Sequence, residues 1–259
     1  MTRFLPFATA LLVAVLFGTA PEAGIVNVLP AAGAAEEDGF SGSLQAPLQW
    51  ERGNTNDLTV GLTSHTRFRT GPNLVLLVLD GELGRANGET YRRRAMGHLR
   101  FRHQLTERVA PEAFTQHSWD PFRRLRSRTL VGVGPRFTLA QGEAGAVFLG
   151  TAWMPEWERY TREEGVGDSG ARVFTHRWSS YLELTLALGD QLLLGHTSYA
   201  QPSFTDLQDV RLSSVTSLRT GLGGAVFLEL RGEVELDRRA AEEVEPLDRR
   251  VRVVLGVEY

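Results

Sequence analysis

Val251-Arg252-Val253-Val254-Leu255-Gly256-Val257-Glu258-Tyr259 ends the chain and decides its fold class. In a β-strand, successive side chains point to opposite faces. Val251, Val253, Leu255, Val257 and Tyr259 therefore share one face, and Arg252, Gly256 and Glu258 share the other. The segment is predicted to be a strand with one apolar and one polar face.

The stretch from Tyr91 to Leu105 repeats this alternation with stronger charge. Ala95, Gly97, Leu99 and Phe101 alternate with a ladder of polar residues, namely Arg92, Arg94, His98, Arg100 and Arg102. In a soluble sandwich the cationic face would be solvated, whereas in a closed barrel it would face a water-filled lumen. The same period of two runs through the whole chain after residue 40.

About twelve strands are expected in all. The first four cover roughly 40–51, 57–65, 75–83 and 91–105, and the others cover 110–122, 127–140, 145–160, 172–189, 191–203, 208–220, 224–238 and 248–259. Short connections at 71–73, 141–143, 189–190 and 221–224 alternate with longer ones at 84–90, 120–127, 161–170, 202–208 and 237–247. We therefore predict an all-β fold, a closed antiparallel transmembrane barrel, in which short turns gather at one end and long loops at the other.

The first 35 residues have the layout of a cleaved signal peptide. Arg3 precedes the apolar run 4–20, and small residues end at Ala35, before three acidic residues. A retained anchor helix is the alternative. Beyond residue 40 no apolar run reaches the roughly 18 residues that a spanning helix needs. Together with the C-terminal strand, which resembles the signal for outer-membrane barrel assembly, this predicts a signal peptide (1–35) and an outer-membrane barrel (36–259).

Composition excludes several classes of function. The 259 residues carry a formal net charge of -3, so the basic field of a nucleic-acid binder is missing. There is no cysteine, which excludes disulfides, thiolate metal sites and thiol catalysis. No cofactor is expected. The expected partners are outer-membrane lipids and the barrel assembly machinery, and the sequence leaves the oligomeric state open.

Several short motifs, taken together in their order along the chain, resemble the salt-induced outer-membrane protein family, often called YdiY-like. They are Gly53-Asn54-Thr55, Arg128 with Gly132-Val133-Gly134-Pro135-Arg136, Gly150-Thr151-Ala152-Trp153-Met154 before Glu156, Tyr199-Ala200-Gln201-Pro202 before Asp209-Val210-Arg211, and Pro246-Leu247-Asp248. The resemblance covers residues 40–259 and implies an outer-membrane location without established enzymatic activity. Tyr259 stands where phenylalanine is more usual.

Candidate functional residues are mostly charged residues on the predicted inner face. We expect a lumen network of Arg92, Arg94, Arg100, Arg102, Arg128, Arg136, Arg177, Arg211, Asp80, Glu82, Glu156, Glu158, Glu183, Glu229, Glu233 and Glu235. Unpaired charges would be costly there, so arginines and carboxylates should pair. Glu156 and Glu158 alternatively offer a cation site. Candidate aromatic girdle residues are Trp50, Phe68, Tyr91, Phe101, Trp153, Trp178 and Tyr259.

Three functions remain open from the sequence. The first is a non-enzymatic structural or stress-related barrel, or a passive small-solute channel. The second is an outer-membrane lipid hydrolase in which His196 and Ser198 act as base and nucleophile. The third is a soluble periplasmic β-protein whose apolar faces form an internal core. Apolar residues on one face of every strand favour the barrel.

Overall fold

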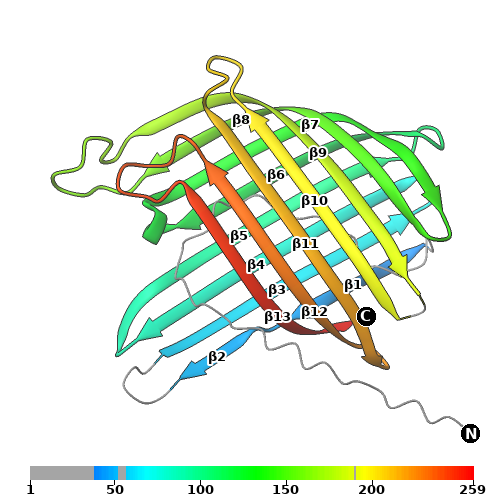
Figure 1. Ribbon diagram of the computed structural model, residues 1–259. Coiled ribbons are helices and arrows are strands. Elements are labelled where there is room, and N and C mark those ends of the chain that lie inside the picture. Colours follow the sequence, from blue (N-terminus) through cyan, green and yellow to red (C-terminus); the bar gives the residue numbers. More distant parts are fainter. Residues whose placement is uncertain (1–37, 52–56, 190) are drawn as a thin grey trace, which may run out of the picture.

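Thirteen β-strands form one antiparallel sheet in the computed structural model (Figure 1). It describes residues 38–51, 57–189 and 191–259, but only the backbone of 49–51. The strands are β1 Gly39–Gln45, β2 Leu48–Glu51, β3 Asp57–Thr70, β4 Asn73–Ala86, β5 Glu89–His103, β6 Val109–Asp120, β7 Leu125–Gly142, β8 Gly145–Tyr160, β9 Arg172–Leu188, β10 Leu192–Pro202, β11 Val210–Gly223, β12 Val226–Asp237 and β13 Leu247–Glu258. A 3-10 helix, η1, covers Pro121–Arg123. The predicted signal peptide and the Gly53-Asn54-Thr55 motif lie outside the described residues.

The sheet closes on itself and has twelve positions around its wall. β1 and β2 both pair with β3, so together they fill one position, and β13 closes the circle by pairing with β1. Every other neighbour follows in sequence order. The prediction of a closed antiparallel barrel of about twelve strands is confirmed. A sandwich around an internal apolar core is wrong, because the strands form a single closed sheet.

The two ends of the barrel carry different connections. The turn end holds the connections 71–72, 104–108, 143–144, 189–191 and 224–225. The loop end holds 87–88, 121–124, 161–171, 203–209 and 238–246. No helix within the described residues is long and apolar enough to cross a membrane.

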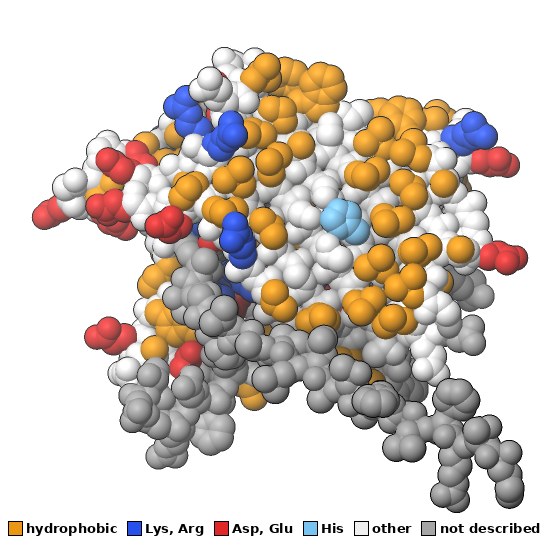
Figure 2. Space-filling model, viewed as in Figure 1, with side chains coloured by type: hydrophobic (Ala, Val, Ile, Leu, Met, Phe, Trp, Pro, Cys, Tyr) orange, Lys and Arg blue, Asp and Glu red, His pale blue; other side chains and the backbone are white. Residues whose placement is uncertain are grey.

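Large apolar side chains point outward. Leu99 is 46% exposed whereas the next residue, Arg100, is 4% exposed, as the alternation of β5 predicts. Figure 2 shows apolar side chains spread over the visible outer face. Among the predicted girdle residues, Trp153 and Trp178 lie opposite each other on β8 and β9 and are half exposed. The Trp50 side chain lies outside the described residues.

Two expectations are wrong, one about a connection and one about a strand. The predicted loop 84–90 is a two-residue turn at Asn87 and Gly88, both with positive φ, as hairpin turns of this type require. Gly84 lies within β4, where an added Cβ would come within 2.8 Å of the Tyr91 ring. It is therefore a packing residue rather than a loop former. The predicted strand 40–51 is divided after Gln45, next to Pro47, whose nitrogen cannot join a ladder.

Hydrogen bonds of the C-terminal residue Tyr259 help to join β13 to β1, the two strands that close the barrel. The Tyr259 amide donates to the Gly42 carbonyl at 3.0 Å, and the Gly42 amide donates to the Tyr259 carbonyl at 2.8 Å. The Tyr259 hydroxyl lies 2.7 Å from the Thr66 hydroxyl on β3. A Cβ at Gly42 would meet the Tyr259 ring at 2.8 Å and the His65 carbonyl at 2.2 Å. Gly42 thus permits the close approach that closes the barrel.

We expect Gly42→Val to weaken closure. The added side chain must displace the His65 carbonyl of β3 and the Tyr259 ring, and overpacking of this kind costs about 1–3 kcal/mol. Urea titration followed by heat-modifiable gel migration should show a lower midpoint of unfolding. Tyr259→Phe, which keeps the ring and the backbone pairing, is the control and should stay near the wild type. Equal midpoints for wild type and Gly42→Val would contradict this account of closure.

Candidate functional site

The inner face of the barrel carries the predicted charged residues. The structure directs the following side chains inward: Arg92, Arg94, Arg100, Arg102, Arg128, Arg136, Arg211, Glu82, Glu156, Glu158, Glu183 and Glu229. The C-terminal set points outward, with Val251, Val253, Leu255, Val257 and Tyr259 between 42% and 65% exposed. The first group therefore lies inside the barrel and the second on its outer surface.

Glu156 is the centre of the densest group. Arg128 donates to it from β7 at 2.6 Å, Arg177 from β9 at 3.0 Å, and Arg211 from β11 at 2.5 Å. Arg211 also donates to Glu158 at 2.9 Å and to Asp237 at 2.7 Å. Glu156 is only 1% exposed. Since β8 and β11 are three positions apart, these contacts reach across the lumen rather than along one strand pair.

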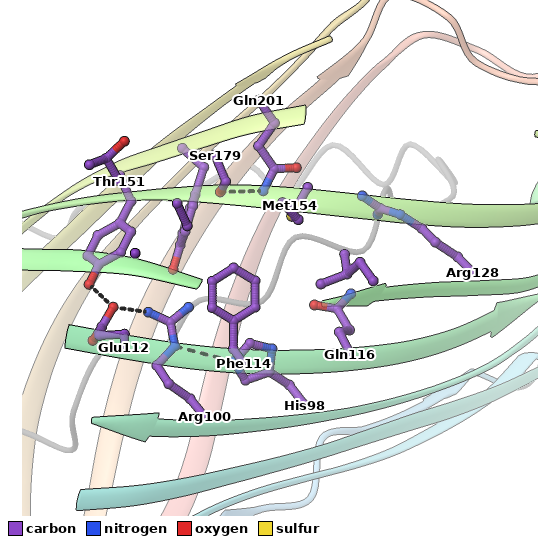
Figure 3. Close-up of a pocket in the computed structure, with 15 residues that line it drawn as sticks. His98, Arg100, Glu112, Phe114, Gln116, Arg128, Thr151, Met154, Ser179 and Gln201 are labelled. Atoms are coloured by element: carbon purple, nitrogen blue, oxygen red, sulfur yellow. Dashed lines mark hydrogen bonds and ion pairs between the residues drawn. The ribbon is translucent and has the colours of Figure 1, made fainter. Parts of the chain in front are cut away.

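Glu112 is the centre of a second group nearer the turn end. Arg100 and Arg102 donate to it at 2.9 and 2.6 Å, and the Tyr181 hydroxyl donates from β9 at 2.7 Å. Figure 3 shows Glu112 and Arg100 beside a small cavity, with Gln201 and Ser179 on its other side, where the Gln201 amide donates to the Ser179 hydroxyl at 3.2 Å. The cavity measures about 20 Å³, which is room for about one water molecule. This part of the lumen is packed.

Several charged side chains on the opposite side of the lumen are more exposed to solvent. The seam wall is defined here as seven partly exposed inward charges on β4, β5, β12 and β13: Asp80, Arg92, Arg94, Arg231, Glu233, Arg250 and Arg252. They lie among more buried charges of the same strands, such as Glu82, Glu229 and Asp248 at 5–9% exposure. The side chains of the seam wall are 13–24% exposed, against 1–6% for the charged groups around Glu156. Arg252 donates to Glu233 at 2.8 Å and lies near enough to Asp80 to interact with it electrostatically. Water therefore reaches this side of the lumen more readily.

The alternative cation site at Glu156 and Glu158 is already occupied by arginine. Glu156 uses both carboxylate oxygens for guanidinium groups, and Glu158 receives Arg211. The described residues contain no group of three or more carboxylate, imidazole or thiol side chains arranged to hold a metal ion. The geometry favours charge pairing at these positions.

His196 and Ser198 meet on the outer face of β10. The His196 Nε2 atom lies 2.8 Å from the Ser198 hydroxyl, and Nδ1 lies 2.9 Å from the Thr216 hydroxyl on β11. Ser198 borders an outer groove of about 610 Å³, lined largely by apolar residues that include Leu182, Leu212 and Leu236. A base next to a nucleophile is the arrangement that acyl transfer requires, but its orienting group is a hydroxyl rather than a carboxylate.

Sequence reasoning missed several inward charges. Arg250 lies on the last strand, where extending the alternation from Arg252 would have found it. Asp237 and Asp248 lie at strand ends on either side of the predicted loop 237–247. Arg123 lies on η1, and no strand periodicity extends to that corner.

Glu156→Gln is expected to destabilise the barrel strongly. Neutralising Glu156 removes the charge that three buried guanidinium groups share, and breaking a buried ion pair costs about 3–5 kcal/mol. Glu163→Gln is the control, because Glu163 pairs with Arg124 at 3.1 Å but its side chain is 43% exposed. Exposed pairs contribute about 0–1 kcal/mol. Urea unfolding in detergent measures both variants, and equal losses would refute the difference.

Comparisons with known proteins agree with this architecture. No curated protein matches the chain. The NanC porin structure aligns with a TM-score of 0.50 and 7% identity over 85% of this chain and 98% of that one. The KdgM porin in complex with disordered oligogalacturonate aligns with a TM-score of 0.43 and 8% identity over 85% of this chain and 98% of that one. The translocator domain of the autotransporter NalP from Neisseria meningitidis aligns with a TM-score of 0.41 and 13% identity over 85% of this chain and 86% of that one. A family model described as "Protein of unknown function, DUF481" matches residues 44–259, and the chain belongs to that family.

Proposed function

We propose that this chain is a non-enzymatic outer-membrane barrel that works as a passive channel for small solutes. The proposal rests on one observation: the charged side chains on the two sides of the lumen differ in how deeply they are buried. Side chains around Glu156 are almost completely buried, whereas those of the seam wall are several times more exposed. A barrel with a wholly structural role would gain stability by packing both sides, so the wetter side is the proposed solute path.

The outer surface supports the membrane setting. Lipid-facing residues of transmembrane barrels are apolar, while residues facing the lumen are polar. Here Leu62, Leu79 and Val253 are each half exposed or more on the outer face. We propose that residues 1–35 direct export, that the C-terminal strand is read by the barrel assembly machinery, and that outer-membrane lipids surround the apolar face. The resemblance to a salt-induced family adds osmotic stress as the condition in which the channel is needed.

Charge on the seam wall should set ion selectivity. In planar bilayers we expect the refolded chain, residues 36–259, to give discrete conductance steps. Arg252→Gln removes a lumen cation and should shift the reversal potential in a KCl gradient toward cation preference. Arg93→Gln is the matched control, because Arg93 is the outward neighbour of the lumen arginines and stacks on Trp119. Folded protein without conductance would refute the channel, and equal shifts in both variants would refute the proposed path.

Lipid hydrolysis remains a second candidate because of one contact, the 2.8 Å pair between His196 and Ser198 beside an apolar groove. If Ser198 is a nucleophile, a lipid-like fluorophosphonate should label it, and His196→Ala should abolish labelling. His117→Ala is the control, since His117 contacts Thr129 at 2.8 Å on the same outer surface. Absence of labelling in folded wild-type protein would eliminate this activity.

A further inference from the structure

The corner between β6 and β7 directs two consecutive arginines to different places. Asp120 caps η1 by accepting the Arg123 amide at 3.3 Å, and Arg124 then adopts a left-handed backbone with φ of 58°. Arg123 points into the lumen and is 7% exposed. Arg124 points toward the loops of the loop end, where it lies within reach of Glu163 and Asp168.

Arg123 reaches the far wall of the barrel. Its Nη2 atom lies 3.1 Å from an Asp248 carboxylate oxygen on β13, and its Nη1 atom lies 4.0 Å from Glu235 on β12. In the order of strands around the wall, β6 and β7 lie about half the circumference from β12 and β13. The contact therefore spans the mouth of the lumen instead of joining neighbouring strands. We call it the mouth strut.

The mouth strut is less firmly bonded than the charged group around Glu156. Within the described residues, neither carboxylate oxygen of Asp248 has a hydrogen-bond partner, and the same holds for Nη1 of Arg123 and one oxygen of Glu235. Attraction between charges holds these groups without the hydrogen bonds that usually compensate for burial. Such a contact is easier to separate than the hydrogen-bonded pairs of Glu156.

Arg124 holds the corner in place from the outside. Its guanidinium donates to the Glu242 carbonyl at 2.9 Å and to the Asp168 carboxylate. Asp168 in turn accepts the Glu242 amide at 2.9 Å, which joins the loops 161–171 and 238–246. Figure 1 shows these loops close to η1 on the left of the view. The corner is thus fixed to the loops while Arg123 crosses the lumen.

We propose that the mouth strut is the constriction of the channel at its loop end, and that Arg123 determines which solutes pass. This inference rests on the proposed channel function and names the residue that limits it. A small solute passes beside the strut along the seam wall. A larger solute passes only when Arg123 separates from Asp248.

Arg123→Ala should raise the unitary conductance severalfold and admit larger polyethylene glycols in a solute-exclusion experiment. Arg219→Ala is the matched control: it also removes one lumen arginine, but Arg219 lies outside the seam wall, towards the turn end, where it pairs with Glu258 at 2.5 Å. The control should change ion selectivity and leave the exclusion size as in the wild type.

Equal exclusion sizes for Arg123→Ala and Arg219→Ala would overturn the constriction while leaving the channel intact. Absence of conductance in the wild type and in Arg123→Ala, with both folded, would instead refute the channel itself. The contact is tested separately with Arg123→Cys and Asp248→Cys in one chain, which has no other cysteine. A short bis-maleimide should join them and hold conductance low. Failure to cross-link in the folded barrel would overturn the strut.

Discussion

Closure of the sheet is the constraint on which the rest of the structure depends. A strand in hydrocarbon finds no water for its amides and carbonyls, so every strand needs two neighbours. The chain supplies them by joining each strand to the next and then pairing β13 with β1. Gly42 and Tyr259 make this last step possible through close approach and paired backbone hydrogen bonds. The apolar outside and polar inside follow, because a closed sheet has only these two faces.

Charge compensation then shapes the lumen. Arginines inside the barrel cannot all be hydrated once their side chains fill the space, so carboxylates are placed where one group serves several cations. Glu156 does this for three strands and Glu112 for two arginines and a tyrosine. The ion pairs hold distant parts of the wall together. Beside β13 the charged side chains are more exposed, and this side of the lumen is the proposed solute path.

Much of this could be predicted from the sequence because strand periodicity is strict. The face of Arg100 or of Leu99 follows from position alone, and so does the pairing of His196 with Ser198 on one surface. The connections were harder, since Gly84 resembles a turn residue but makes room for Tyr91. The mouth strut was beyond prediction. It depends on which residues face each other across the barrel, and a single sequence gives neighbours along strands, not partners across a lumen.

The order of strands also has a consequence for how the barrel forms. Consecutive strands can pair as hairpins, and each pairing has a small entropic cost because it closes only a short loop. The pairing of β1 with β13 is different, because it joins opposite ends of the chain. Contacts between distant residues slow folding. The barrel should therefore accumulate as a curved, open sheet whose final and slowest event is the meeting of its two edges. Until then, both edges remain free to pair with another protein.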